Sequence, residues 1–298
     1  MRDKQTGLFY LFISPWLLGF LGLTAGPMLY SLYMSFTDWQ IFGDANWVGL
    51  SNYKTLFHDK IFWISLWNTL YYTFISVPLG LVFGYLLAVL LNQKVKGLGV
   101  FRTIFYLPSI VPAVASSLLW LLVFQPEFGL ANAILSYLHL PTSNWIMSEH
   151  MVKPSLIIMS LWGVGGGMVI YLAGLQSVSP SLYEAAEIDG ATRWKKFWRI
   201  TVPMTSNVIF FSLIMGLIGS FQIFTQAFVM TTDASGQNGG PNYASTFYVL
   251  YLYNNAFKYF KMGYASALAW VLFLIIILFT FIQFKVFGKK VYYEAEDQ

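Results

Sequence analysis

Cysteine is absent from this chain of 298 residues, and charged side chains make up only 10% of it. The lack of cysteine excludes disulfide bonds and thiolate chemistry but does not identify a cellular compartment. Charged residues usually make up about 25% of a soluble domain. Because the hydrophobic fraction reaches 57%, the shortage of charge indicates an integral membrane protein.

Six charge-free intervals each contain a strongly apolar run, long enough for the ~20 residues with which a helix crosses the hydrocarbon core. We therefore predict an all-α integral membrane protein with six transmembrane helices, forming a single domain over residues 1–298. A further charge-free interval, 234–257, is broken by glycine, proline and asparagine, and we predict that it lies outside the membrane. The predicted spans are approximately 8–36, 69–92, 103–125, 155–177, 204–229 and 264–286.

Lysine and arginine are distributed unevenly over the segments between the predicted spans. Twelve fall in the segments assigned to the inner side and five in the outer loops, which places both termini in the cytoplasm by the positive-inside rule. The segment 179–203, between the fourth and fifth spans, then lies in the cytoplasm as well. The net charge of +4 follows from this topology and requires no nucleic acid as a partner.

The six charge-free intervals contain no histidine either, since His58, His139 and His150 fall in the outer loops. An ion-coupled carrier usually needs ionisable groups at membrane depth, although Na⁺ can be held by carbonyls and hydroxyls, so a self-sufficient secondary carrier is disfavoured. There is no HExxH motif, no pair of carboxylates within the spans and no phosphate-binding loop. We therefore predict no catalytic residue and no metal site, and any energy for uphill movement comes from another subunit.

One polar segment interrupts this apolar chain, with seven charged side chains between residues 184 and 199. Ser179 and Pro180 are predicted to begin a short helix, and Ser181 and Glu184 have the spacing of a capping box. The dipeptide Asp189–Gly190 supplies a turn, because glycine adopts a positive φ without penalty. A second amphipathic piece, with aromatic residues among cations, completes a predicted helix-turn-helix projection.

This projection has two interpretations on physical grounds. Cations beside aromatic side chains are typical of an amphipathic loop that lies on anionic lipid. The small side chains of Ala185 and Ala186, together with Gly190, favour instead a close contact with another protein.

The stretch EAAEIDGATRWKKFWRITVP resembles the EAA loop of membrane subunits in binding-protein-dependent ABC importers. The stretches GLSNYKTLF, WNTLYYT, FRTIFYLPSIVPAV and PEFGLANAIL resemble the carbohydrate branch of that family, the maltose and glycerol-phosphate type permeases. Nearly the whole chain is covered by the resemblance, and Val202 stands where the EAA pattern usually has Leu. The positions that match the EAA pattern are Glu184, Ala185, Ala186, Asp189, Gly190, Ala191, Phe197, Ile200 and Pro203.

The resemblance implies the architecture of a type I ABC importer permease in a bacterial cell membrane. It implies a non-enzymatic subunit that passes a carbohydrate, an oligosaccharide or related polyol, across the membrane. The EAA loop, 179–203, would couple this subunit to a separate ATPase, which binds ATP and Mg²⁺, so no cofactor is expected in this chain. The implied partners are a companion permease in a heterodimer, two ATPase subunits and an external solute-binding protein.

The fifth predicted span carries Ser220, Gln222, Thr225 and Gln226 in an otherwise apolar run. Amides and hydroxyls at membrane depth need partners, so these side chains face either neighbouring helices or a substrate pathway. The resemblance implies that this span lines the sugar site and that Trp162 and Gly163 approach the same site. The family often has Asn where this chain has Ser220 and Gln222, so the sugar is not carried over, and another polar solute, a glycerol phosphodiester or a polyamine, remains an alternative.

Overall fold

The computed structural model describes residues 2–41, 43–93, 96–233, 236–288 and 291–292. Helices dominate this part of the chain, and its only extended pairing is an isolated antiparallel bridge between Thr37 and Trp47, so the prediction of an all-α protein is confirmed there. The chain divides into two compact units, one formed by Met1–Lys60 and Leu252–Leu274 and the other by Ile61–Tyr251 and Ile275–Gln298.

The first unit contains one long apolar helical run near the N-terminus, followed by a short helix. Asn52 fixes the end of the run, because its Nδ2 donates to the carbonyl oxygens of Ser35 (2.9 Å) and Thr37 (2.8 Å), which the helix leaves without partners. The elements are α1 (Arg2–Phe20), the π-helix η1 (Leu21–Ala25), α2 (Gly26–Met34), α3 (Ser51–His58), the π-helix η5 (Asn254–Lys258) and the first half of α16 (Met262–Phe287).

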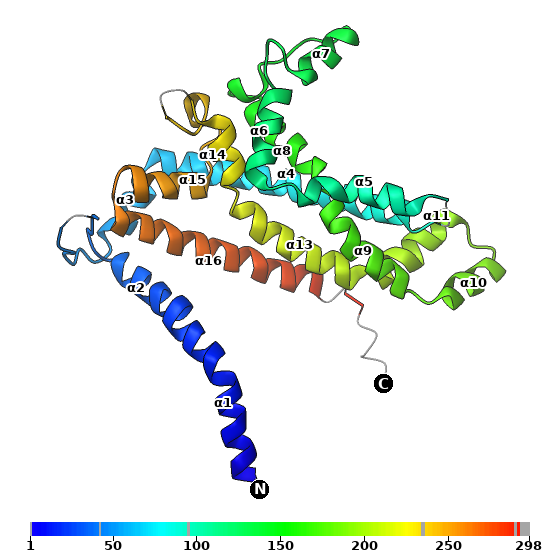
Figure 1. The fold of residues 1–298 in the computed structure, drawn as a ribbon, viewed down its shortest axis with the longest axis horizontal. Helices are drawn as coiled ribbons and strands as arrows, with labels where there is room; N and C mark the ends of the chain where they lie inside the picture. Colours follow the sequence, from blue (N-terminus) through cyan, green and yellow to red (C-terminus); the bar gives the residue numbers. More distant parts are fainter. Residues whose placement is uncertain (1, 42, 94–95, 234–235, 289–290, 293–298) are drawn as a thin grey trace. The chain divides into compact units, whose positions relative to one another are not determined.

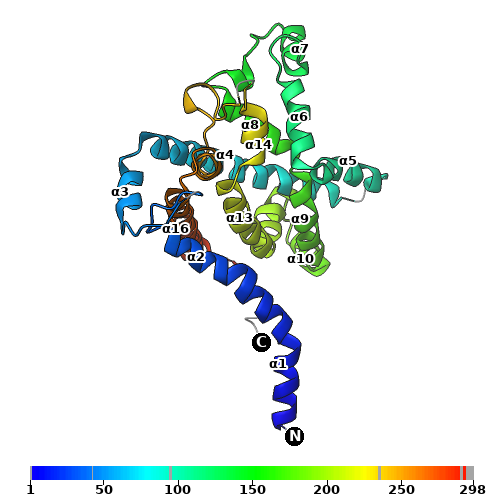
Figure 2. The ribbon, with the colours of Figure 1, turned by 60° about the vertical axis from the view of Figure 1, so that its left-hand side comes forward.

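The second unit holds most of the helices, drawn mainly from cyan to yellow in Figures 1 and 2, and also the second half of α16. The helix α15 (Tyr248–Tyr253) has residues in both units. The remaining elements in chain order are α4 (Lys60–Leu91), α5 (Leu98–Ile110), α6 (Ala113–Val123), α7 (Leu130–Tyr137), η2 (Trp145–Met147), α8 (Val152–Trp162), α9 (Gly165–Ser177), α10 (Pro180–Ile188), α11 (Arg193–Lys196), the π-helix η3 (Phe197–Thr201), α12 (Val202–Met204), α13 (Ser206–Phe221), α14 (Thr225–Thr231) and η4 (Pro241–Tyr243).

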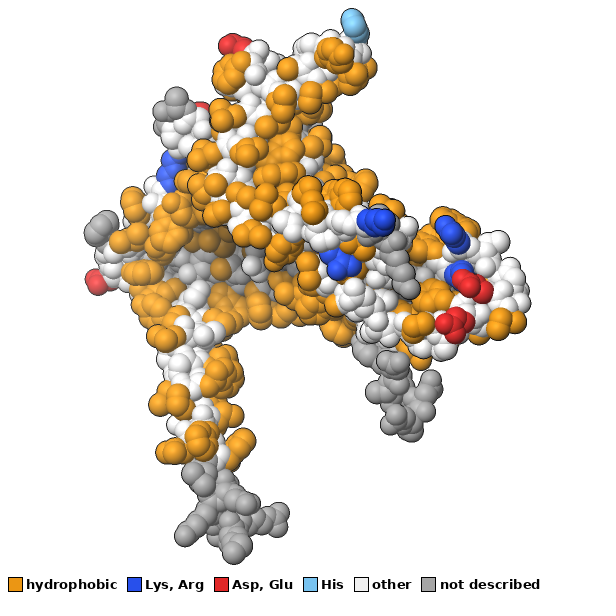
Figure 3. All heavy atoms as spheres, turned by 45° about the vertical axis from the view of Figure 1, so that its right-hand side comes forward, with side chains coloured by type: hydrophobic (Ala, Val, Ile, Leu, Met, Phe, Trp, Pro, Cys, Tyr) orange, Lys and Arg blue, Asp and Glu red, His pale blue; other side chains and the backbone are white. Residues whose placement is uncertain are grey.

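Three unbroken helical stretches in the described residues are long and apolar enough to cross a membrane: Phe9–Met34, Lys60–Leu91 and Met262–Phe287. Three pairs of shorter helices qualify if each pair is one bent span, which gives up to six spans. The bends are 98° between α5 and α6, 48° between α8 and α9, and 65° between the Arg193–Met204 run and α13. Much of the surface in Figure 3 is covered by hydrophobic side chains, as a lipid-facing surface requires.

The helix breaks were not anticipated from the sequence, and the break between α5 and α6 has a local cause. Pro112 cannot donate a backbone hydrogen bond and forces the preceding Val111 into an extended conformation, at ψ 128°, so α5 ends there. In the predicted span 204–229, α13 ends at Phe221, and α14 begins only at Thr225. The intervening Phe224 has φ −139° and ψ −61°, outside the helical region.

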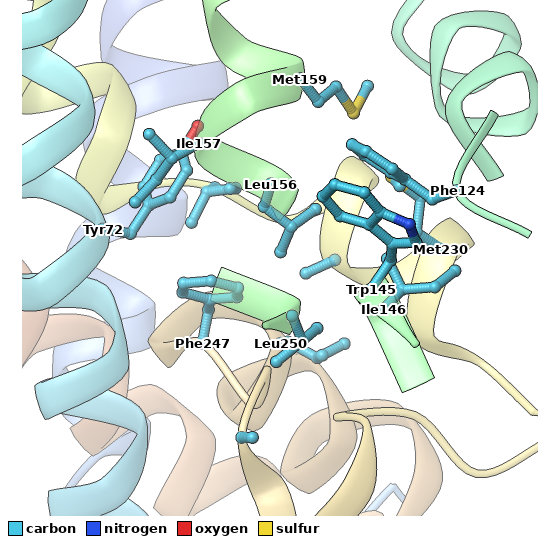
Figure 4. Close-up of a cluster of buried hydrophobic side chains, with 14 residues drawn as sticks. Tyr72, Phe124, Trp145, Ile146, Leu156, Ile157, Met159, Met230, Phe247 and Leu250 are labelled. Atoms are coloured by element: carbon cyan, nitrogen blue, oxygen red, sulfur yellow. The ribbon is translucent and has the colours of Figure 1, made fainter. Parts of the chain in front are cut away.

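Two hydrophobic clusters hold the second unit together at different levels of α4. The larger one, shown in Figure 4, gathers Tyr72 of α4 with Phe124, Trp145, Leu156, Phe247 and others from α6, η2, α8 and the α15 region. The second joins Tyr85, Ala88 and Leu91 of α4 to Met168, Tyr171, Leu172 and Leu175 of α9. Pro78 lies in α4 between the two clusters.

Candidate functional site

A cavity of about 650 Å³ lies along α4 between these two clusters, and α8, α9, α13 and α14 form its other walls. This volume falls within the range of small-molecule sites. Aliphatic residues, phenylalanine, methionine and glycine supply most of the wall, and none of the described residues that line it is charged. The polar groups of the lining are Tyr72, Ser76, Ser160, Tyr171, Ser212, Ser220, Gln222, Thr225 and Gln226.

A second cavity of about 260 Å³ adjoins the first, because both are lined by Tyr72, Ala113, Ser160, Gly163 and Gln226. The interruptions of the helices meet at these cavities. Val111 at the α5–α6 bend lines the smaller cavity, Gly163 at the α8–α9 bend lines both, and Gln222 to Phe224 line the larger one. Where a helix is interrupted, backbone groups that would be bonded within it become available to a solute in the cavity.

The structure brings all the residues predicted for the substrate pathway to the two cavities. Gly163, Ser220, Gln222, Thr225 and Gln226 line the larger cavity, and Trp162, the last residue of α8, lines the smaller one.

These side chains differ in how freely they present hydrogen-bonding groups. Gln222 directly follows α13, lines the larger cavity and is exposed. Ser220 is only 8% exposed, and its Oγ donates to the Leu217 carbonyl over 2.9 Å, which commits its proton within the helix. Gln222 is therefore the stronger candidate of the two for contact with a solute.

Several lining residues were missed from the sequence, chiefly Tyr72 and Ser76 of α4 and Ser160 of α8. Tyr72 and Ser76 are four residues apart and lie on one face of the helix, in line with the buried Asn68. This four-residue spacing of polar groups in an apolar run is a signal that could have identified them.

The predicted projection at 179–203 is present, and its first helix, α10, begins as expected with Ser179 as N-cap and Pro180 as the first residue. The expected capping box is wrong. Ser179, and not Ser181, is the N-cap, and its hydroxyl is within 2.8 Å of the Ser181 hydroxyl instead of capping a backbone N–H. Glu184 and Ala185 are exposed on α10, and Ala186 is half-buried.

The turn after α10 has the hydrogen bonds of a Schellman motif. Gly190 adopts φ +71°, the Gly190 N–H donates to Glu187 O (3.0 Å), and the Ala191 N–H donates to Ala186 O (2.8 Å). Asp189 is the C-cap residue of the helix. The turn predicted at Asp189–Gly190 is confirmed, and its positive φ favours glycine.

The second part of the projection, α11 and η3, is tied back to α10 at two points. Tyr183 OH lies 3.1 Å from Thr201 Oγ1, and the Lys196 ammonium forms an ion pair with Glu187 that lowers the pKa of this carboxyl. Phe197 packs at 6.2 Å from the Tyr85 ring of α4, next to the second hydrophobic cluster. The projection is therefore anchored in the helices that line the cavity.

Comparisons with known proteins agree with this architecture. Residues 80–291 match the family model described as "Binding-protein-dependent transport system inner membrane component". The chain is 41% identical over 300 residues to the probable ABC transporter permease protein YesP of Bacillus subtilis, covering 100% of this chain and 95% of that protein. It is 35% identical over 283 residues to the arabinooligosaccharides transport system permease protein AraP of Bacillus subtilis, covering 94% of this chain and 88% of that protein.

The fold is also similar to that of a chain in the crystal structure of a bacterial alginate ABC transporter in complex with alginate pentasaccharide-bound periplasmic protein. The TM-score is 0.82 at 24% sequence identity, covering 95% of this chain and 94% of that chain. The relatives named above are transport permeases and not enzymes. The chain belongs to the family of binding-protein-dependent transport system inner membrane components, as a sugar-type permease subunit of an ABC transporter.

Proposed function

We propose that this chain forms one half of the pathway of an ATP-driven importer for a neutral carbohydrate, and that the solute passes through the cavity beside Gln222. The single observation that carries the proposal is the lining of this cavity, in which uncharged amides and hydroxyls stand beside aromatic rings. The amides of Gln222 and Gln226 can bond sugar hydroxyls, while the ring of Phe224 can pack on the C–H faces of a sugar.

The alternative solutes fit this lining less well. A glycerol phosphodiester carries a negative charge and a polyamine carries several positive charges. A charge taken from water into a cavity at membrane depth needs an opposite charge or many hydrogen bonds to replace its hydration. The described residues around the cavity offer no charge of either sign, so a neutral polyhydroxy solute is favoured.

The projection at 179–203, hereafter the EAA projection, would transmit the action of a separate ATPase to this cavity. In our proposal α10 contacts the ATPase through Glu184, Ala185 and Ala186. ATP and Mg²⁺ are bound by the ATPase and not by this chain. The run from Arg193 to Met204 leads into α13 at Thr205, whose Oγ1 lies 2.7 Å from the Tyr85 hydroxyl. The 16 residues of α13 then extend roughly 24 Å to the cavity residues at Ser220 and Gln222.

The complete transporter would contain a companion permease across the pathway, two ATPase subunits and a solute-binding protein that delivers the sugar to the outer loops. Movement of the two permease halves against each other would open the cavity first to one side and then to the other. The arabinooligosaccharide system named for AraP supports an oligosaccharide as the solute.

The proposal is tested by reconstituting this chain into proteoliposomes, alone and with its partners, and measuring uptake of a neutral oligosaccharide, a glycerol phosphodiester and a polyamine. We expect uptake of the oligosaccharide only, and only with ATP, ATPase and binding protein present. Uptake by the chain alone would identify a secondary carrier. Uptake of a charged solute in place of the oligosaccharide would reject the neutral carbohydrate.

A further inference from the structure

We propose that the second part of the EAA projection, the segment Arg193–Thr201 hereafter called the basic arm, binds anionic phospholipid headgroups, while α10 alone contacts the ATPase. The inference rests on the proposed function, which places this loop on the ATPase side of the membrane. The two partners suggested by the sequence, lipid and protein, are thereby assigned to different halves of one projection.

The charges of the projection are separated by sign between its two halves. The acidic groups, Glu184, Glu187 and Asp189, belong to α10 and its C-cap, whereas the basic arm carries Arg193, Lys195, Lys196 and Arg199. Red and blue side chains gather on this projection at the right of Figure 3. Among the described residues, Lys196 is the one cation of the arm that has an ion-pair partner, Glu187. The side chains of Arg193, Lys195 and Arg199 are exposed and form no ion pair in the described residues, although the charge of Arg193 also acts on Glu187.

Two exposed indoles lie among these cations. Trp194 is 71% exposed and Trp198 is 52% exposed, and their rings pack edge to face at 5.6 Å. Both rings also contact Phe197, which in turn packs against the buried Tyr85 of α4. Indole rings beside lysine and arginine are typical of protein segments at the bilayer interface. There the ring enters the headgroup layer and the cation contacts phosphate.

The direction of the basic arm suits this position. The Arg193–Met204 run makes an angle of 65° with α13, which belongs to the candidate span of that pair. A helix that diverges this strongly from a spanning helix runs closer to the membrane plane than to the membrane normal, because spanning helices are tilted by about 20° on average. This direction allows the cations of the arm to lie along the surface of the bilayer.

Binding of the arm to headgroups has a consequence for coupling. The contacts Tyr183 to Thr201 and Glu187 to Lys196 connect α10 to the arm. An arm held on the lipid surface therefore fixes the height and direction at which α10 is presented to the ATPase. The charge of the surrounding lipid should then change how effectively ATP hydrolysis is coupled to the permease.

The test uses the complete transporter in nanodiscs. Because this chain has no cysteine, Trp198→Cys and Ala185→Cys each introduce one labelling site for an environment-sensitive fluorophore, in complexes whose other subunits lack accessible cysteines. The nanodiscs contain phosphatidylcholine alone or mixed with phosphatidylglycerol, and spin-labelled headgroups serve as quenchers. We expect the spin-labelled headgroups to quench the probe at position 198, and its emission to shift to the blue when phosphatidylglycerol is present. The emission of the probe at position 185 should change when the ATPase binds and not with the lipid composition.

The cations are tested in the same nanodiscs. The single variant Lys195→Gln should weaken the response of the position-198 probe to phosphatidylglycerol about fivefold, and the triple variant Arg193→Gln, Lys195→Gln, Arg199→Gln should abolish it. The matched control removes the same number of charges from the loops predicted to be outer, with Lys54→Gln, Lys258→Gln and Lys261→Gln, and should keep the response.

Two outcomes would overturn the inference. If the emission of the probe at position 198 does not change with lipid charge, and the ATPase shields the probe from the quencher, the basic arm belongs to the protein contact. An unchanged lipid response in the triple variant would remove the role of its cations. Both measurements require neither solute nor ATP, so their outcome is independent of whether the neutral carbohydrate proposed above is the transported solute.

Discussion

Lys153 Nζ donates a hydrogen bond to Asn68 Oδ1 over 3.0 Å, which joins α8 to α4. The amide of Asn68 in turn donates to the carbonyl oxygens of Tyr243 (2.9 Å) and Thr246 (3.1 Å) in the segment before α15. One asparagine, 2% exposed, thus connects three segments that are far apart in the sequence. It lies one helical turn before Tyr72 of the cavity lining.

The first prediction concerns this connection. Asn68→Leu leaves the two carbonyls without their donor, and each unsatisfied buried acceptor costs about 1 to 3 kcal/mol. We expect a clearly lower melting temperature of the purified protein in detergent, measured by the loss of helical circular dichroism. Lys153→Met removes only one donor and should lower it less. Equal melting temperatures for Asn68→Leu and the unsubstituted protein would show that the connection contributes nothing to stability.

The second prediction concerns the turn of the EAA projection. At φ +71° Gly190 has no described atom within 4 Å of the position that a Cβ would occupy, so the cost of Gly190→Val, at least ~1 to 2 kcal/mol, comes from the backbone and not from a collision. The spans should still insert, while α10 points in a different direction. We expect near-normal amounts in the membrane and loss of binding-protein-stimulated ATP hydrolysis and of uptake.

Gly190→Asn is the matched control for this turn, because asparagine tolerates the left-handed conformation. It should retain most of the stimulated ATP hydrolysis. Full stimulation in Gly190→Val would remove the turn from the coupling mechanism.

The third prediction concerns the cavity. Gln222→Leu preserves size and suits the apolar surroundings but loses hydrogen bonds to the solute worth about 0.5 to 1.5 kcal/mol each. We expect reduced uptake with an intact complex, measured as initial rates over a range of solute concentrations. Gln176→Leu makes the same change at an exposed position of α9 that does not line the cavity. It should transport normally, and equal rates for the two variants would assign Gln222 to packing.

The fourth prediction concerns orientation, which the distribution of lysine and arginine implies. Reporter domains fused after Gln298 or inserted between residues 185 and 200 should be cytoplasmic, and one inserted near Gly239 should be external. Fluorescence and phosphatase reporters measured in parallel distinguish the two sides. An external reporter at 185–200 would exclude contact between α10 and a cytoplasmic ATPase.

The helical class and the EAA projection could be predicted from the sequence, because apolar runs and a dense motif are both formed by residues that are close together in the sequence. The turn at Gly190 was predictable for the same reason, since its cause is the residue itself. The cavity was only half predictable. Gln222 and Gln226 are conspicuous in an apolar span, but Ser76 and Ser160 are single hydroxyls whose neighbours come from other helices. Their role depends on which helix faces meet, and that is decided by packing over long sequence distances.

The position of the cavity on α4, between two separately packed clusters, has a mechanical consequence. Tyr72 belongs to one cluster and Tyr85 to the other, while the helix between them passes the cavity and contains Pro78. A proline inside a helix removes one backbone hydrogen bond and makes the helix easier to bend at that point. Bending of α4 at Pro78 would change the angle between the two clusters, and with it the width of the cavity, without disturbing the packing within each cluster.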